Sequence, residues 1–159
     1  MTILYRLINK LKKFSKLSFR DQWLLIQVFI LSGIVRFAIL FLPFYKLARF
    51  AGKYKEESPQ LLNDIEKVNM NKIAWAVWIV SRYTPWESKC FVKALTAQIM
   101  LKKRKVSTTL YLGVAKDEKN NPIAHAWLRS GTDIITGGSG YRSFTQVAKF
   151  ATNIGGEKQ

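Results

Sequence analysis

The sequence predicts an α+β protein in which a basic, apolar helical region precedes a cysteine-bearing helix and a small antiparallel sheet. Up to about residue 104, apolar residues mostly recur three or four positions apart, which is the period of helices with one buried face. From residue 108 onward the period changes to two, as in strands. With 159 residues, 48% of them hydrophobic, the chain can bury a core as one domain, or as a small domain with an appended helical region.

The first part of the chain reads as three helices. Apolar residues at helical spacing, with lysines on the other face, predict a short amphipathic helix over residues 3–13. Ser18, followed three residues later by an aspartate, resembles a capping box and predicts a helix over 19–42, ahead of a proline. A further short helix is expected over 44–53, where a glycine stops it.

The polar, proline-containing segment 55–59 is the predicted boundary between two parts of the chain. We expect residues 1–57 to form a basic apolar helical region that docks a partner or a membrane. Residues 58–159 are then the core that carries the cysteine.

Three more helices are expected in the first half of that core. They cover residues 59–67, 71–83 and 86–104, and Thr84-Pro85 breaks the chain before the last of them. On the last helix Cys90 shares one narrow face with alanines four and seven residues later, and these small side chains let a strand pack closely.

Three strands follow the cysteine helix. The polar segment 116–121 is a hairpin loop between the first two, and the glycine-rich segment 137–141 is an active-site rim or a plain turn. A final short helix is expected over 143–151. The strands themselves are predicted at residues 108–115, 123–129 and 132–136.

Charge is concentrated at the N-terminal end. Residues 1–55 hold eleven Lys and Arg against Asp21 alone, a net charge of +10 out of +16 for the chain. Such a surface favours an acidic partner, and nucleic acid, an anionic membrane and an acidic protein or peptide are the three candidates. Nucleic acid is the least supported, because the sequence has no zinc-ligand spacing, no RNA-binding signature and no helix-turn-helix pattern.

A membrane is the serious rival partner, because residues 22–42 would span about 30 Å as a helix. Arg36 lies well inside this segment, polar and small residues weaken its middle, and both flanks are basic. These features favour a buried or interfacial helix, or two helices broken near residues 32–33, over a transmembrane span. The sequence shows no secretory signal and only one cysteine, which fits a cytoplasmic protein with or without membrane association.

Two residues that each occur once carry the candidate chemistry. Cys90 lies in the first turn of its predicted helix, where the free backbone N–H groups, the helix dipole and the neighbouring Lys89 favour thiolate over thiol. His125 lies in an apolar run that ends at a turn, as a strand would. A helix-borne thiol facing a strand-borne imidazole is the minimum machinery of cysteine acyl transfer. The alternative is that both residues belong to the core.

A spaced combination of motifs over roughly residues 70–150 resembles the transglutaminase-like leader peptidases of lasso-peptide biosynthesis. The resemblance implies that 58–159 is a transglutaminase-like cysteine peptidase core, with the α+β architecture of papain-like and transglutaminase-like enzymes. The motifs are Trp86 four residues before Cys90, then Phe91, Ala94 and Ala97, the segment Leu-Tyr-Leu-Gly-Val at 110–114, and His-Ala-Trp-Leu at 125–128.

The expected mechanism is attack of the Cys90 thiolate on a peptide carbonyl, giving an acyl-enzyme that water hydrolyses. His125 would act first as general base and then as the acid that protonates the leaving amine. The backbone N–H of Cys90 is the candidate oxyanion donor. Trp86 and Trp127 are candidate substrate-binding residues, with burial in the core as the alternative for Trp86.

The third member of the triad is where this chain departs from the family. Relatives place an aspartate about twelve residues after the histidine, and here that position is Gly137. The nearest acid, Asp133, is the candidate; whether it faces His125 depends on the strand register, and pairing with Arg129 is the alternative. Orienting an imidazole needs only an acceptor, so Asn121 or a backbone carbonyl could serve and a Cys-His dyad is allowed.

The resemblance implies a ribosomally made precursor peptide as substrate and a small leader-binding protein as partner. An ATP-dependent macrolactam cyclase is a further candidate partner, and neither a cofactor nor a metal is expected. Two other functions stay open: a non-catalytic membrane-associated adaptor of a peptide-maturation complex, and an acyl transferase that exchanges amides with the same Cys-His pair.

Overall fold

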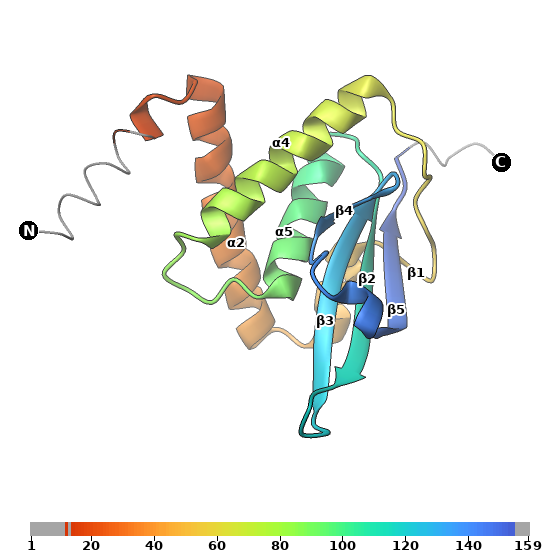
Figure 1. Cartoon of the computed structure of the whole chain (residues 1–159). Coiled ribbons are helices and arrows are strands. Elements are labelled where there is room, and N and C mark those ends of the chain that lie inside the picture. The colour runs from red at the N-terminus through yellow and green to blue at the C-terminus, as the bar shows by residue number, and fades with distance from the viewer. Residues whose placement is uncertain (1–11, 13, 155–159) are drawn as a thin grey trace, which may run out of the picture.

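A computed structural model describes residue 12 and residues 14–154 of the chain. It confirms the α+β prediction: the described part has four α-helices and a five-stranded antiparallel sheet. Figure 1 shows the helices stacked on one side of the sheet. The helices are α2 (Phe19–Phe41), α3 (Phe44–Ala51), α4 (Asp64–Ser81) and α5 (Cys90–Lys103). The strands are β1 (Lys53–Tyr54), β2 (Thr108–Lys116), β3 (Pro122–Ser130), β4 (Asp133–Thr136) and β5 (Thr145–Thr152), and η1 (Tyr141–Ser143) is a short 3-10 helix.

The helices expected over 19–42 and 44–53 are confirmed as α2 and α3. The Oγ of Ser18 accepts a hydrogen bond from the backbone N–H of Asp21 at 3.2 Å, so the cap read from the sequence does start α2. The three predicted strands and the hairpin loop are also confirmed. The helix predicted over 3–13 lies almost entirely outside the described residues.

Two expectations are wrong. One helix, α4, replaces the two expected before residue 84, and Asn63 starts it by a capping box in which Asn63 and Glu66 cap each other's backbone N–H groups. The residues just before Asn63 form no helix. The final helix expected over 143–151 is strand β5, which pairs with both β1 and β2. Cross-strand pairing outweighs local propensity there.

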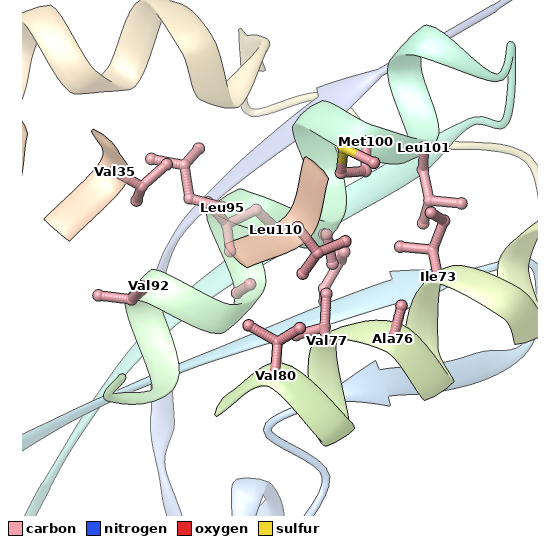
Figure 2. Close-up of a cluster of buried hydrophobic side chains, with 14 of the residues drawn as sticks. Val35, Ile73, Ala76, Val77, Val80, Val92, Leu95, Met100, Leu101 and Leu110 are labelled. Carbon is pink, nitrogen blue, oxygen red and sulfur yellow. The ribbon is translucent and has the colours of Figure 1, made fainter. Parts of the chain in front are cut away.

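The sheet order is β1-β5-β2-β3-β4, and α5 packs against its central part while α2 and α4 pack against α5. Because it is enclosed in this way, α5 buries eight of its fourteen residues. Figure 2 shows side chains from four elements meeting around α5: Val35 of α2, Ile73, Ala76, Val77 and Val80 of α4, Val92, Leu95, Met100 and Leu101 of α5, and Leu110 of β2.

The region before residue 57 takes part in this same core. Leu24, Leu25 and Val28 of α2 and Ala51 of α3 are buried members of it. The division of the chain at residue 57 stays a prediction. By length and composition α2 could also cross a membrane, and it is the one described helix of which this is true.

On the other face of the sheet, side chains of β2 and β3 contact the segment before α4 and the short helix η1. The guanidinium of Arg129 donates to the hydroxyl of Tyr111 at 3.0 Å and to the carbonyl of Ser58 at 2.9 Å. Beside it, Glu57 accepts a 2.9 Å hydrogen bond from the ammonium of Lys149. These contacts hold the extended segment before α4 against β2, β3 and β5.

The pKa of Glu57 is lowered, first by its hydrogen bond to Lys149 and further by the charges of Lys149 and Arg129, against partial burial. A lowered pKa in the folded state stabilises the protein above the unfolded value of about 4.3, and this contribution is lost as pH falls through the folded pKa. Glu57→Gln should therefore lower the free energy of unfolding at neutral pH. The carboxylate is partly exposed, so we expect a loss of at most about 1 kcal/mol.

Urea unfolding followed by circular dichroism at neutral and acidic pH checks this prediction. The difference between Glu57→Gln and wild type should vanish in acid, because both side chains are then uncharged. Glu118→Gln, in the exposed hairpin loop, is the matched control and should change little at either pH. An equal loss at both pH values would contradict the ion-pair explanation.

Candidate active site

Cys90 is the first residue of α5, and the expectation that the helix starts at Trp86 is wrong by four residues. The N-cap is Lys89, whose side chain makes no capping hydrogen bond. The backbone N–H groups of the first turn have no acceptor within the helix, so they are free to donate to a group at the thiol. The thiol is free and partly exposed.

The loop before Cys90 is tied together and tied to α2. Thr84 and Ser88 share a 2.9 Å hydrogen bond between their hydroxyls. Glu87 forms ion pairs with Arg36 of α2 at 3.3 Å and with Lys89 at 3.0 Å. The ammonium of Lys89, expected to favour the thiolate, is thus paired with a carboxylate.

Trp86 packs against α2. A Cβ added to Gly33 would lie 3.1 Å from two ring atoms of Trp86, and the Phe29 ring centroid lies 4.8 Å from that of Trp86. The indole Nε1 is buried without a hydrogen-bond partner. The tryptophan thus fixes the loop of the candidate nucleophile to α2, and its role in substrate binding stays a prediction.

His125 is half-buried on β3, and its Nε2 lies 2.8 Å from the carbonyl oxygen of Gly137. A carbonyl only accepts hydrogen bonds, so Nε2 carries the hydrogen and Nδ1 of the neutral ring is left to accept a proton. The Phe144 ring centroid lies 4.9 Å from the imidazole centroid. A backbone carbonyl was one of the acceptors expected to orient the imidazole. In the structure, the carbonyl of Gly137 holds this position.

The thiol and the imidazole lie on different sides of the sheet. Cys90 packs against the core between helices and sheet, and that core includes Ala126 and Leu128 of β3. Side chains alternate along a strand, so His125 and Trp127 point to the opposite face. Both residues are described, and no hydrogen bond joins them. The sequence could not show this, because periodicity does not say which face a helix covers.

The structure does not bring Asp133 to the imidazole. The register pairs Asp133 with Ser130, five residues along β3 from His125. Asp133 is exposed, and its alternative partner Arg129 forms an ion pair with Glu57 at 3.7 Å instead. Orientation of His125 by Asp133 would need a different register.

Trp127 is 5% exposed and stacks on Tyr111, with ring centroids 5.6 Å apart. Gly113, opposite His125 on β2, leaves the space that the rings of this face occupy: a Cβ there would lie 2.8 Å from Trp127 and 2.9 Å from Phe144. Trp127 therefore supports the His125 face of the sheet, and its contact with substrate stays a prediction.

The contacts between α2 and the Cys90 loop were not predicted from the sequence. One signal for them was present: Arg36 is the only charged residue in an otherwise apolar stretch, and a partly buried charge is usually paired.

Among residues 12 and 14–154, no three His, Cys, Asp or Glu side chains cluster closely enough to hold a metal ion.

Comparison with known proteins gives one result. The family model described as the transglutaminase-like superfamily matches residues 34–149, which include Cys90, His125 and the last third of α2. No curated protein and no solved structure gives a significant match.

The contact of Gly33 with Trp86 yields a prediction. Gly33→Leu should lower the free energy of unfolding by about 1–3 kcal/mol, because the new side chain must displace the ring that anchors the Cys90 loop. In a Trp86→Ala background the same substitution should cost much less, since the space is vacated. Urea unfolding of the two single variants, the double variant and wild type measures the coupling. Additive effects would show that the ring and Gly33 do not interact.

Proposed function

Because the chain belongs to the transglutaminase-like superfamily, whose members are usually cysteine peptidases or acyltransferases, we propose that it is a cysteine peptidase that removes the leader from a ribosomally made lasso-peptide precursor. The observation that carries this proposal is the position of Cys90. The only cysteine of the chain is the first residue of the central helix of the matched domain. At that position the free backbone N–H groups of the first turn can donate to an oxyanion that forms beside the sulfur.

In the proposed reaction the Cys90 sulfur attacks the carbonyl carbon of the scissile peptide bond. The backbone N–H of Cys90 donates to the oxyanion, and the leaving amine takes its proton from the imidazolium of His125. Water, deprotonated by the same imidazole, then hydrolyses the thioester and releases the free thiol. Nδ1 of His125 is the base, because Nε2 is committed to Gly137.

This mechanism requires the imidazole to reach the thiol. In a substrate-free site, catalytic hydrogen bonds often form only when substrate is bound, so we propose that precursor binding closes the site around the edge of β3. β4 pairs with β3 only at residues 128–130, so residues 122–127 of β3 have no strand partner on that side; Gly137 packs against the backbone of Ala126 and Trp127 there.

The proposed partners follow from the same assignment. A small leader-binding protein would present the precursor, and the basic N-terminal region would dock that protein, an acidic leader or the ATP-dependent macrolactam cyclase. With a ribosomally made precursor as substrate, we propose a cytoplasmic location, with or without membrane association.

A second candidate is a non-catalytic, membrane-associated adaptor of the same maturation machinery. The observation that favours it is the placement of Cys90 and His125 on different sides of the sheet. In an adaptor both side chains would serve packing alone. An amide-exchanging acyl transferase remains the third candidate, and differs only in whether an amine or water resolves the thioester.

The decisive experiment is cleavage of the precursor from the same genomic neighbourhood, with its leader-binding protein, followed by mass spectrometry. Wild type should cleave at one site. Cys90→Ala should abolish cleavage, and His125→Ala should lower the rate by about 10²–10⁴-fold, the usual contribution of general acid–base catalysis. No cleavage by folded wild type would favour the adaptor, and adducts formed with added amines would identify the acyl transferase.

A separate prediction concerns Asp133. Since the Gly137 carbonyl already holds the imidazole, Asp133→Asn should leave the cleavage rate within about twofold of wild type, far from the large losses of true catalytic groups. The same precursor assay measures it, with His125→Ala as the reference for a large loss. If Asp133→Asn lowered the cleavage rate as much as His125→Ala does, Asp133 would be the third member of a Cys-His-Asp triad.

A further inference from the structure

The outward face of α2 carries an unbroken row of exposed apolar side chains, which we call the outward stripe. Its members recur three or four residues apart and therefore lie along one side of the helix. Their exposed fractions run from 39% to 82%. The outward stripe consists of Phe19, Trp23, Ile26, Ile30, Ile34, Phe37 and Phe41.

The opposite face of α2 is already in use. Leu24, Leu25, Val28 and Val35 are buried in the core beneath α4 and α5, and Figure 1 shows α2 at the outer side of the helical layer, away from the sheet. A helix that is apolar all round normally lies in a protein core or in a membrane. In the described chain, α2 is covered on only one side.

No charge interrupts the outward stripe. The three charged residues of α2 are Arg20, Asp21 and Arg36. Asp21 accepts a hydrogen bond from Ser18 and lies 3.8 Å from Lys72, and Arg36 is held by Glu87. Arg20 is exposed one turn before Trp23, at the end of the helix.

Basic side chains flank the outward stripe at both ends along the chain. Lys12, Lys16 and Arg20 are exposed at its start, and Lys46 and Arg49 of α3, the next helix, are exposed beyond its end. Only one acidic residue, Asp21, lies among the first 55 residues. Along the chain, exposed basic residues thus lie both before and after the outward stripe.

The exposed apolar row and the basic residues together indicate what kind of partner binds this face of α2. A second copy of the chain would bring the net charge of +10 of its own residues 1–55 against the same region of the first, which opposes association through this face. The surface of an anionic bilayer offers acyl chains to the apolar row and acidic headgroups to both basic ends. Aromatic residues such as Trp23 also favour the membrane interface.

We propose that the outward stripe of α2 docks in the plane of an anionic lipid bilayer, with the basic residues at its two ends on the headgroups. The helix lies along the surface and does not cross the bilayer, because its other face stays in the protein core. Through Trp86 and Glu87, which contact α2, docking would hold the Cys90 loop near the membrane. The proposal does not depend on peptidase activity.

Flotation of the full chain with vesicles tests this. Binding should be strong to vesicles of phosphatidylcholine mixed with phosphatidylglycerol, weak to phosphatidylcholine alone, and reduced by salt. The double variant Ile30→Gln/Phe37→Gln keeps the charge and should bind about tenfold more weakly or worse. The matched control is Leu61→Gln/Val147→Gln, which makes the same change at side chains that are 90% and 55% exposed elsewhere, and should bind like wild type.

A fluorescent label separates docking by this face from general charge attraction. In a Cys90→Ala background, an environment-sensitive dye on Ile30→Cys should shift its emission to the blue on anionic vesicles, while the same dye on Leu61→Cys should not. Circular dichroism confirms that each variant is folded.

Several outcomes would overturn the proposal. These are no vesicle binding, equal loss of binding in the stripe and control variants, and retention in membranes after carbonate extraction, which would make α2 a span. Dimerisation in sedimentation that Ile30→Gln/Phe37→Gln abolishes, without lipid binding, would assign the face to a second copy.

Discussion

The enclosure of α5 is the constraint on which the rest of the structure depends. Leu95, Leu101 and the small residues Ala94 and Ala97 are almost fully buried between the sheet and the other helices. Each large apolar side chain buried in this way stabilises the fold by about 1.5–3 kcal/mol. Because α5 is held on all sides, the position of its first residue, Cys90, is set by the core.

The same packing determines on which face of the sheet the His125 imidazole lies. Moving the imidazole to the α5 face of the sheet would take a one-residue shift in strand register. Such a shift would expose Ala126 and Leu128, which are 1% and 0% exposed. Register slippage is therefore costly, and any meeting of imidazole and thiol must go around the edge of β3.

The α2 helix links the proposed peptidase site to the proposed membrane-docking surface. Its inner face completes the core, its contacts with Trp86 and Glu87 hold the loop before Cys90, and its outer face is apolar. A membrane-docked peptidase and a membrane-docked adaptor would both use this arrangement. The two differ only in whether Cys90 and His125 take part in a reaction. Membrane binding and peptide cleavage are therefore separable properties of the same fold.

Local patterns in the sequence determined the α+β class, the bounds of α2 and α3, the three strands after α5 and the place of Cys90 in its first turn. Periodicity and caps encode such features because they arise from residues a few positions apart. The start of α4 was also written locally, in the capping box of Asn63 and Glu66. Tertiary structure alone decided that 145–152 is a strand and that His125 faces away from α5. It also decided that Gly137, rather than Asp133, contacts the imidazole. Each of these depends on register or on contacts between residues far apart in the chain, which no local spacing encodes.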